Sequence, residues 1–177
     1  MAQARTAGGG IWRWAAGFAL ATAGMATILA LQPGSVDLGA LLEIRPHAPD
    51  LAPLARQDVV VRLHVWTVFY ALVVGPIQFL LPKGTRLHRQ LGWSWFLAML
   101  VTALSSLFIR EINHGGFSFI HLFSAWTFVS LPLAIWTIRR GDVRAHRGIM
   151  VGLYVGLVIA GVLAIAPGRV IWDMFFG

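Results

Sequence analysis

Five long apolar runs constrain this chain more than any other feature of its sequence. They cover approximately residues 11–31, 59–81, 87–109, 117–138 and 148–166. A helix crosses a hydrocarbon core of about 30 Å with about 20 apolar residues, so each run is long enough to span a membrane. We therefore predict an all-α membrane protein: one domain over residues 1–177, a bundle of about five transmembrane helices with a four-helix core.

The composition excludes a typical soluble domain and narrows the range of partners. Hydrophobic residues make up 58% of the chain and charged residues 12%, whereas soluble domains contain about 25% charged residues. The net charge of +7 would point to nucleic acid in a soluble protein. Here the cations flank the apolar runs, where they orient helices and contact anionic lipid. We expect the lipid bilayer as a partner, and no nucleic acid.

The connections between the runs differ in length. Those between the last four runs are short, so consecutive helices should be antiparallel neighbours. Residues 32–58 contain four prolines and should form an irregular external loop, with a short interfacial helix near residues 36–44. The first run could be a secretory signal because Arg5 and Arg13 precede its apolar part. It is long, however, and no clean cleavage site follows, so we expect it to remain as a helix.

The basic residues predict how the helices are oriented. Nine are expected on one side of the membrane, namely Arg5, Arg13, Lys83, Arg86, Arg89, Arg139, Arg140, Arg144 and Arg147, and five on the other, namely Arg45, Arg56, Arg62, Arg110 and Arg169. Cytoplasmic loops carry an excess of Lys and Arg. The chain should therefore lie in a bacterial inner membrane, with its N-terminus in the cytoplasm and its C-terminus in the periplasm.

Four histidines stand at the starts of four successive predicted helices. His64 and His121 lie about one turn into their helices, and His88 and His146 begin theirs. Because the helices alternate in direction, His64 and His121 should share the outer leaflet, and His88 and His146 the inner leaflet. Polar groups within a membrane are costly and tend to mark function. Of the two other histidines, His114 is a weaker candidate ligand in a loop.

Two histidine pairs at two depths are typical of two bis-histidine b-type haems. Haem iron takes an axial imidazole on each face of the porphyrin, and a helical bundle supplies such ligands from facing helices. Cations near each pair would neutralise the propionates. These are Arg62 for the outer pair, and Arg86, Arg89 and Arg147 for the inner pair. The chain has no cysteine, which excludes disulfides, thiolate metal sites and covalently attached haem.

Several other features favour a structural role. Small residues recur every fourth position in the last run and indicate helix packing; they are Gly148, Gly152, Gly156, Ala160 and Ala164. The Gly75-Pro76 pair should kink its helix and free backbone carbonyls, one of which Gln78 could satisfy. Tyr70 and Tyr154 could relay electrons or protons, but we favour burial with one hydrogen bond for each. Most tryptophans should be interfacial anchors, namely Trp66, Trp93, Trp95, Trp126, Trp136 and Trp172.

The polar residues of the runs offer little catalytic chemistry. Ser105 and Ser106 are in phase with neither a carboxylate nor a histidine. All seven acidic residues fall in loops or at helix ends. This pattern argues against an ion-coupled transporter and against an intramembrane protease.

From about Leu63 onward the chain contains six notable segments: LHVWTVFYALVVGPIQFL, KGTRLHRQLGWSW, VTALSSLFIR, GGFSFIHLFSAWT, RRGDVRAHRGIMVGLYVG and APGR. In these segments the chain resembles the uncharacterised DUF2306 family of bacterial membrane proteins. The paired LHR and AHR elements are fairly specific. This resemblance implies a membrane bundle and carries no activity with it.

The positions of the four histidines also resemble the layout of the cytochrome b561 family. That resemblance implies four core helices with one haem ligand each, pairing His64 with His121 and His88 with His146. Sequence identity outside this layout is slight, and the chain has no obvious sixth helix, which leaves the electron donor open.

Three functions remain open at this point. The first is transmembrane electron transfer through two b haems, between a cytoplasmic and a periplasmic redox protein or a quinone, as in a quinol- or small-reductant-linked oxidoreductase. The second is a haem-free accessory or structural subunit of a larger membrane complex. The third is copper or zinc bound by one histidine pair, although two ligands would leave such a site underfilled.

Overall fold

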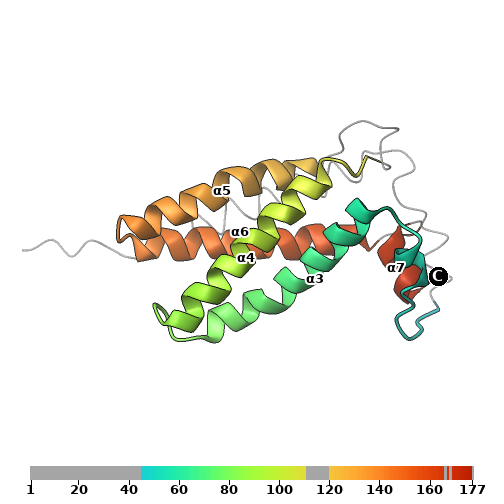
Figure 1. Ribbon diagram of the computed structural model, residues 1–177, viewed down its shortest axis with the longest axis horizontal. Coiled ribbons are helices and arrows are strands. Elements are labelled where there is room, and N and C mark those ends of the chain that lie inside the picture. The colour runs from blue at the N-terminus through green and yellow to red at the C-terminus, as the bar shows by residue number, and fades with distance from the viewer. Residues whose placement is uncertain (1–44, 111–119, 166, 168, 177) are drawn as a thin grey trace, which may run out of the picture. The chain divides into compact units, whose positions relative to one another are not determined.

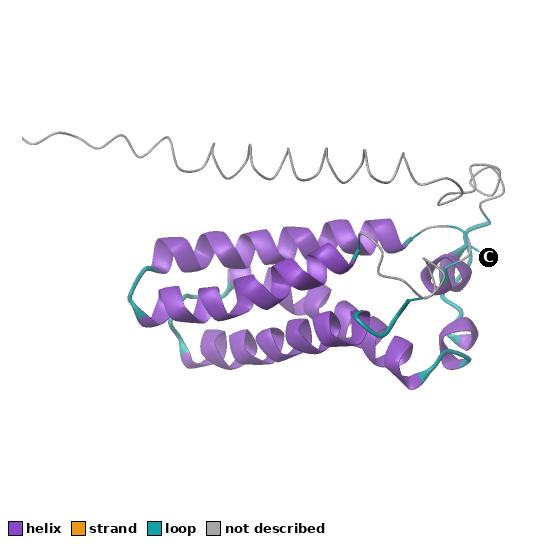
Figure 2. Cartoon of the chain, turned by 90° about the horizontal axis from the view of Figure 1, so that it is seen from above, coloured by secondary structure: helices purple, strands orange, loops and turns teal. Residues whose placement is uncertain are grey.

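The computed structural model describes residues 45–110, 120–165, 167 and 169–176. The chain divides into two compact units, residues 1–37 and 38–177. The first unit, with the helix predicted at residues 11–31, lies outside the described residues, as does the short helix predicted near residues 36–44. Within the described ranges every regular element is a helix (Figure 2). These helices are α2 (Ala52–Ala55), α3 (Val59–Leu80), α4 (Arg86–Ser106), α5 (His121–Arg139), α6 (Val143–Ala164) and α7 (Val170–Phe175).

The four long helices close into a ring. Helix α3 packs against α4 and α6, and α5 packs against the same two helices. Figure 1 shows α3 and α4 as one hairpin and α5 and α6 as another, with both hairpin loops at the same end. This arrangement confirms the predicted all-α class and the antiparallel order of neighbouring helices. We call the hairpin-loop end the basic end, because seven cations lie there: Lys83, Arg86, Arg89, Arg139, Arg140, Arg144 and Arg147.

The helix boundaries follow capping groups more closely than hydropathy. The Thr85 hydroxyl accepts from the His88 amide at the start of α4, and the Asp142 carboxylate accepts from the Ala145 amide at the start of α6. Side chains that accept amide protons there are typical N-caps. Helix α6 therefore begins five residues before the predicted residue 148. Helix α4 ends at Ser106, three residues before the prediction.

Three of the described helices, α3, α5 and α6, are long and apolar enough to cross a membrane. Helix α4 has 21 residues, which extend over about 31 Å at 1.5 Å per residue. It begins with the polar sequence RLHRQ, which lowers its hydropathy. Large apolar side chains are exposed along the bundle, including Leu80, Val129 and Phe108. Such surfaces are compatible with lipid as the surrounding solvent.

The core of the bundle is centred on Trp95, whose side chain is 2% exposed. It packs with a cluster of buried residues from all four long helices, namely Ala71, Val74, Ala98, Met99, Leu131, Leu153 and Leu157. The prediction that Trp95 is an interfacial anchor is therefore wrong. Trp172 is also buried, at 8% exposed, whereas Trp66, Trp93, Trp126 and Trp136 are each at least 50% exposed. For these four the role of interfacial anchor stays a prediction.

Pro76 lies inside α3 and leaves a carbonyl without its usual backbone donor. The hydroxyl of Tyr154 donates to the carbonyl oxygen of Leu72, four residues earlier, at 3.2 Å. Trp95 Nε1 donates to the neighbouring carbonyl of Ala71 at 3.0 Å. Tyr154 thus makes the predicted hydrogen bond and is half-buried. The same prediction is wrong for the burial of Tyr70, whose side chain is 41% exposed. The suggestion that Gln78 satisfies a freed carbonyl of α3 is wrong, because its amide nitrogen donates to a carbonyl of α4.

The row of small residues on α6 is packed over only part of its length. A Cβ built on Gly156 would contact the ring of Phe123 of α5 at 3.7 Å, in ordinary van der Waals contact. Ala160 and Ala164 line a cavity. At Gly148 and Gly152 a Cβ would meet nothing within 4 Å in the described structure.

A short C-terminal helix closes the end opposite the basic end. Helix α7 packs against α2, and Leu54, Val65 and Met174 form a second buried cluster there. The backbone amides of His47 and Asp50 donate to the carbonyls of Phe175 and Met174, at 3.1 and 2.9 Å. We call this the capped end. Neither α2 nor α7 is predicted by the sequence.

Candidate cofactor site

A cavity of about 340 Å³ lies in the half of the bundle nearer the capped end. Its wall comes from all four long helices, with Ile171 added from α7. Most lining side chains are apolar. The polar lining residues are His64, Thr102, Ser106, Ser124 and Thr127. Ligand pockets in proteins have volumes of about 300–1,000 Å³ and a few placed polar groups in an apolar wall. This cavity meets both conditions, at the low end of the volume range.

The hydrogen bonds of His64 define its tautomer. Its Nδ1 lies 3.1 Å from the carbonyl oxygen of Thr102 and 3.0 Å from the hydroxyl oxygen of Ser105. A carbonyl oxygen only accepts, so in a neutral imidazole Nδ1 carries the proton and donates. Ser105 Oγ lies 2.7 Å from the carbonyl of Val101, to which it donates. The lone pair of His64 therefore resides on Nε2, which is available as a ligand or an acceptor.

The prediction that Ser105 is in phase with no histidine is wrong. Ser105 lies on α4 and its histidine partner on α3, so a search along one helix misses the contact. Two further pairs join the same helices. The Thr102 hydroxyl donates to the Thr67 hydroxyl at 2.8 Å, and Tyr70 donates to Ser94 at 2.7 Å. These hydroxyls form a polar seam between α3 and α4, with His64 at one end of it.

His121 is the first residue of α5, at the same end of the bundle as His64. The prediction placed it one turn inside its helix. Its Nε2 is buried. The neighbouring residues Ile120, Phe123 and Ser124 line the cavity, and His121 itself does not. Ser124 also hydrogen-bonds Ser106, which joins α5 to α4 at this level. The cavity wall thus holds one predicted ligand, and the other lies beside it.

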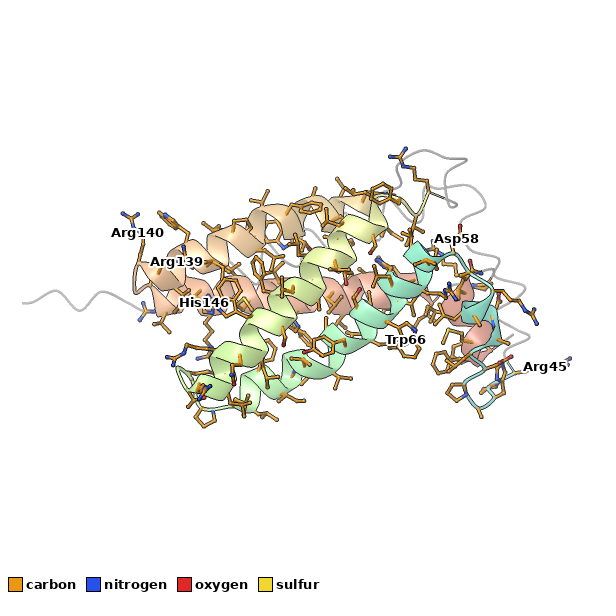
Figure 3. The ribbon with its side chains drawn as sticks, in the orientation of Figure 1. Arg45, Asp58, Trp66, Arg139, Arg140 and His146 are labelled. Atoms are coloured by element: carbon orange, nitrogen blue, oxygen red, sulfur yellow. The ribbon has the colours of Figure 1, made fainter. Side chains whose placement is uncertain are left out.

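The second predicted pair lies at the basic end. His88 is in the first turn of α4 and His146 in the first turn of α6, and the two are close enough for their charges to interact. Figure 3 shows His146 at the same end as Arg139 and Arg140, away from Asp58 and Trp66. The Nδ1 of His146 lies 2.9 Å from the carbonyl of Ala134 on α5. By the same argument as for His64, it donates there and leaves its lone pair on Nε2.

His88 differs from the other two. Its Nδ1 is buried and has no hydrogen-bond partner. The amide nitrogen of Gln78 donates to the backbone carbonyl of His88 at 3.0 Å, and the amide oxygen of Gln78 is also buried without a partner. Buried polar atoms are rarely unpaired in proteins, so this corner of the bundle carries unused hydrogen-bonding capacity.

The four arginines predicted to neutralise propionates are all exposed. Arg86, Arg89 and Arg147 lie at the basic end with His88 and His146, and Arg89 donates to the carbonyl of Gly84 at 3.1 Å. Arg62 lies in the first turn of α3, two residues before His64. Residues two apart do not share a helical face, so Arg62 and His64 lie on different faces of α3.

The described residues contain no group of three or more His, Cys, Asp or Glu side chains that could hold a metal ion. Zinc sites use three or four protein ligands. The described residues therefore do not supply a complete set of ligands for copper or zinc.

Residues 61–177 match the family described as "Predicted membrane protein (DUF2306)". The chain belongs to this family. The DUF2306 region covers about two-thirds of the chain and includes all four candidate histidines. Together with the three membrane-length helices, the match identifies a membrane protein whose apolar helices contact lipid. No curated protein and no solved structure matches the chain. The likeness to the cytochrome b561 family therefore stays a prediction from the histidine layout.

Proposed function

We propose that this DUF2306 protein transfers electrons across the membrane through two b-type haems. His64 with His121 would hold one haem, and His88 with His146 the other. One observation carries the proposal: His64 and His146 each donate Nδ1–H to a carbonyl on a neighbouring helix. Metal-ligating histidines almost always donate their other ring N–H in this way, which orients the ring and raises the basicity of the ligand nitrogen.

At the capped end, the residues fit a haem in chemistry better than in volume. His64 offers an Nε2 lone pair at a cavity with an apolar wall, and Gly156, Gly161 and Ala160 contribute little bulk to that wall. Porphyrin sites in membrane bundles need such a wall because it excludes water and sets the dielectric. A cavity of about 340 Å³ is small for a macrocycle of this size. Loading would therefore require wall side chains to move aside.

At the basic end, the residues fit in ligand type and in charge. His88 and His146 lie in the first turns of α4 and α6 at the basic end, together with three exposed arginines, Arg86, Arg89 and Arg147. Guanidinium groups pair well with carboxylates, including propionates. This end of the described chain has one carboxylate, Asp142, and it caps α6. Its cations are thus available to an anionic cofactor edge or to lipid.

The residues of the chain would have simple tasks in this function. The bound haems would supply reversible one-electron chemistry. The carbonyls of Thr102 and Ala134 hold the imidazoles in one tautomer, and the apolar core around Trp95 keeps water out of the space between the two levels. The electrons would pass between a quinone or small reductant on one side and a redox protein on the other. By the positive-inside rule we propose the basic end for the cytoplasmic face of a bacterial inner membrane and the C-terminus for the periplasm.

The visible absorption spectrum of the purified protein tests the proposal directly. The full chain, purified in detergent from haem-replete cells, should show a Soret band, and reduction with dithionite should produce sharp b-type bands. The haem content should be two per chain. His64→Ala and His88→Ala should each remove about half of the haem, with different spectral components lost. Tyr70→Phe is a matched control, because Tyr70 lies on the polar seam but not in the cavity wall. Equal spectral losses in the two histidine variants would break the assignment to two levels.

A second candidate is a haem-free subunit of a larger membrane complex. The observation that favours it is the open face of α6 at Gly148 and Gly152, where the described structure places nothing within 4 Å of a built Cβ. Such small residues permit close approach of another helix. Colourless protein from haem-replete cells, which also runs as part of a larger assembly before purification, would favour this function over electron transfer.

A further inference from the structure

Three histidines of the bundle can be compared through their Nδ1 atoms. In His64 and His146 this atom donates to a carbonyl oxygen of the neighbouring helix, at 3.1 and 2.9 Å. In His88 it is buried and has no partner. An unpaired buried polar group loses its hydration without compensation. The third histidine therefore lacks the one contact that the other two share.

An unused acceptor lies on Gln78, a residue of α3 that contacts His88 across the α3–α4 pair. Gln78 of α3 is buried, and its Nε2 donates to the backbone carbonyl of His88 at 3.0 Å. A carbonyl cannot donate, so the nitrogen of the amide must face it and the oxygen must point elsewhere. That oxygen, Oε1, is buried with no partner. One acceptor and one nitrogen able to donate are thus both unpaired, on two residues in direct contact.

We infer that Gln78 is the positioning residue of His88, with its Oε1 accepting the Nδ1–H of that imidazole. The final torsion of a glutamine side chain is broad and costs little to rotate. Gly92 leaves room for the movement, since a Cβ built there would lie 3.7 Å from Gln78 Nε2. The contact places the proton of His88 on Nδ1 and the lone pair on Nε2. All three histidines then share one tautomer.

The inference deepens the proposed function, because it rests on that function wherever the Nε2 of His88 is taken as a haem ligand. It differs from a purely structural role for Gln78. In that role Gln78 only supplies an amide donor to the His88 carbonyl at the start of α4, and its oxygen has no task. The two roles differ in whether Oε1 of Gln78 accepts a hydrogen bond from His88.

Two variants isolate that atom. Gln78→Leu removes both the donor and the acceptor at similar volume. Gln78→Glu keeps an acceptor oxygen and, when protonated, also a donor. The full chain labelled with ¹⁵N-histidine is compared in detergent after haem removal, with His88→Ala to assign the His88 signals. In the parent protein, His88 should show a protonated Nδ1 and an unprotonated Nε2. Gln78→Leu should convert this to a mixture of tautomers, and Gln78→Glu should restore the parent pattern.

An unchanged tautomer in Gln78→Leu, or equal patterns in the Leu and Glu variants, would overturn the inference. If Gln78→Leu does not fold, Gln78→Met removes the same polar atoms on a flexible side chain and takes its place. Haem titration gives a second readout. Loss of a ligand-orienting contact typically weakens metal binding about 10–100-fold, so Gln78→Leu should weaken binding of one haem by that factor and leave the other unchanged. A parent chain that binds no haem would defeat the proposed function, while the tautomer comparison would still decide the role of Gln78.

Discussion

The hydroxyl of Tyr154 donates to the carbonyl oxygen of Leu72 at 3.2 Å, where Pro76 has removed the backbone donor. A tyrosine of α6 thus completes the hydrogen bonding of α3 across the bundle. The ring of the same tyrosine fills the space above Gly75, where a Cβ would overlap it. The Gly75-Pro76 pair and Tyr154 therefore act as one unit. The proline removes the backbone donor to the Leu72 carbonyl, and the glycine leaves room for the tyrosine that replaces this donor.

Removing the Tyr154 hydroxyl should destabilise the parent protein but should have little effect in a variant that lacks Pro76. Interhelical hydrogen bonds in membrane proteins contribute about 0.6 kcal/mol on average, with a maximum of about 1.7 kcal/mol. We expect Tyr154→Phe to lower the free energy of unfolding within that range. In a Pro76→Ala background, the restored amide of residue 76 can donate to Leu72, so Tyr154→Phe should have little further effect. Reversible unfolding in mixed detergent measures the coupling, and additive effects would contradict it.

Adding a methyl group at Gly75 should be costly, because the ring of Tyr154 occupies that position. Overpacking a core typically destabilises a protein by about 1–3 kcal/mol, and we expect Gly75→Ala to fall in that range. The matched control is Gly152→Ala on α6, where a Cβ meets nothing within 4 Å in the described structure. There the better helix propensity of alanine should stabilise the protein by about 0.5–1 kcal/mol. Thermal unfolding of both variants should show a lower melting temperature for Gly75→Ala and a higher one for Gly152→Ala than for the parent protein.

Two tryptophans of α4, two residues apart, should respond differently to substitution. Trp95 is 2% exposed and donates to the carbonyl of Ala71, whereas Trp93 is 50% exposed. Trp95→Phe leaves that carbonyl without its side-chain donor and opens space in the core, so we expect a loss of about 1–3 kcal/mol. Trp93→Phe should change the free energy of unfolding by less than about 0.5 kcal/mol. Equal effects in chemical unfolding would contradict the assigned burial.

Filling the cavity should block the cofactor without unfolding the bundle. Ala160 lines the cavity, and a phenylalanine at this position would occupy part of its volume of about 340 Å³. If the cavity receives a haem, Ala160→Phe should lose about one of the two expected haems. Val151→Phe is the matched control, because Val151 is 40% exposed on the same helix and is not in the wall. Haem content per chain, measured as the pyridine complex, separates the two variants.

The sequence predicts the long helices well because each one must bury an apolar length equal to the thickness of a bilayer. Boundaries that depend on single capping groups, such as Asp142 at the start of α6, are not visible in hydropathy. The sequence also predicts that histidines stand near four helix starts. It cannot show which atoms they contact. Ser105 and the carbonyls of Thr102 and Ala134 become partners only through the register of one helix against another.

The same limit explains the errors for tryptophan and for the chain end. Trp93 and Trp95 have similar neighbours in sequence, and only the docking of α4 decides which of them faces the core. Helix α7 is too short to give a clear period. Its backbone partners, His47 and Asp50, are more than a hundred residues away in the sequence. Contacts of this kind depend on the assembled bundle and not on any local pattern.

Two of the acceptors that orient the histidines are main-chain atoms, at Thr102 and Ala134. No substitution of the side chain at either position deletes the oxygen itself. Substitutions that fit the space at these positions, such as Thr102→Ser or Ala134→Ser, should therefore keep the same imidazole tautomer, provided each helix keeps its rotation and its axial position. Insertion or deletion of a single residue in α4 or α5 would rotate the helix and turn the carbonyl oxygen of Thr102 or Ala134 away from the imidazole that it orients.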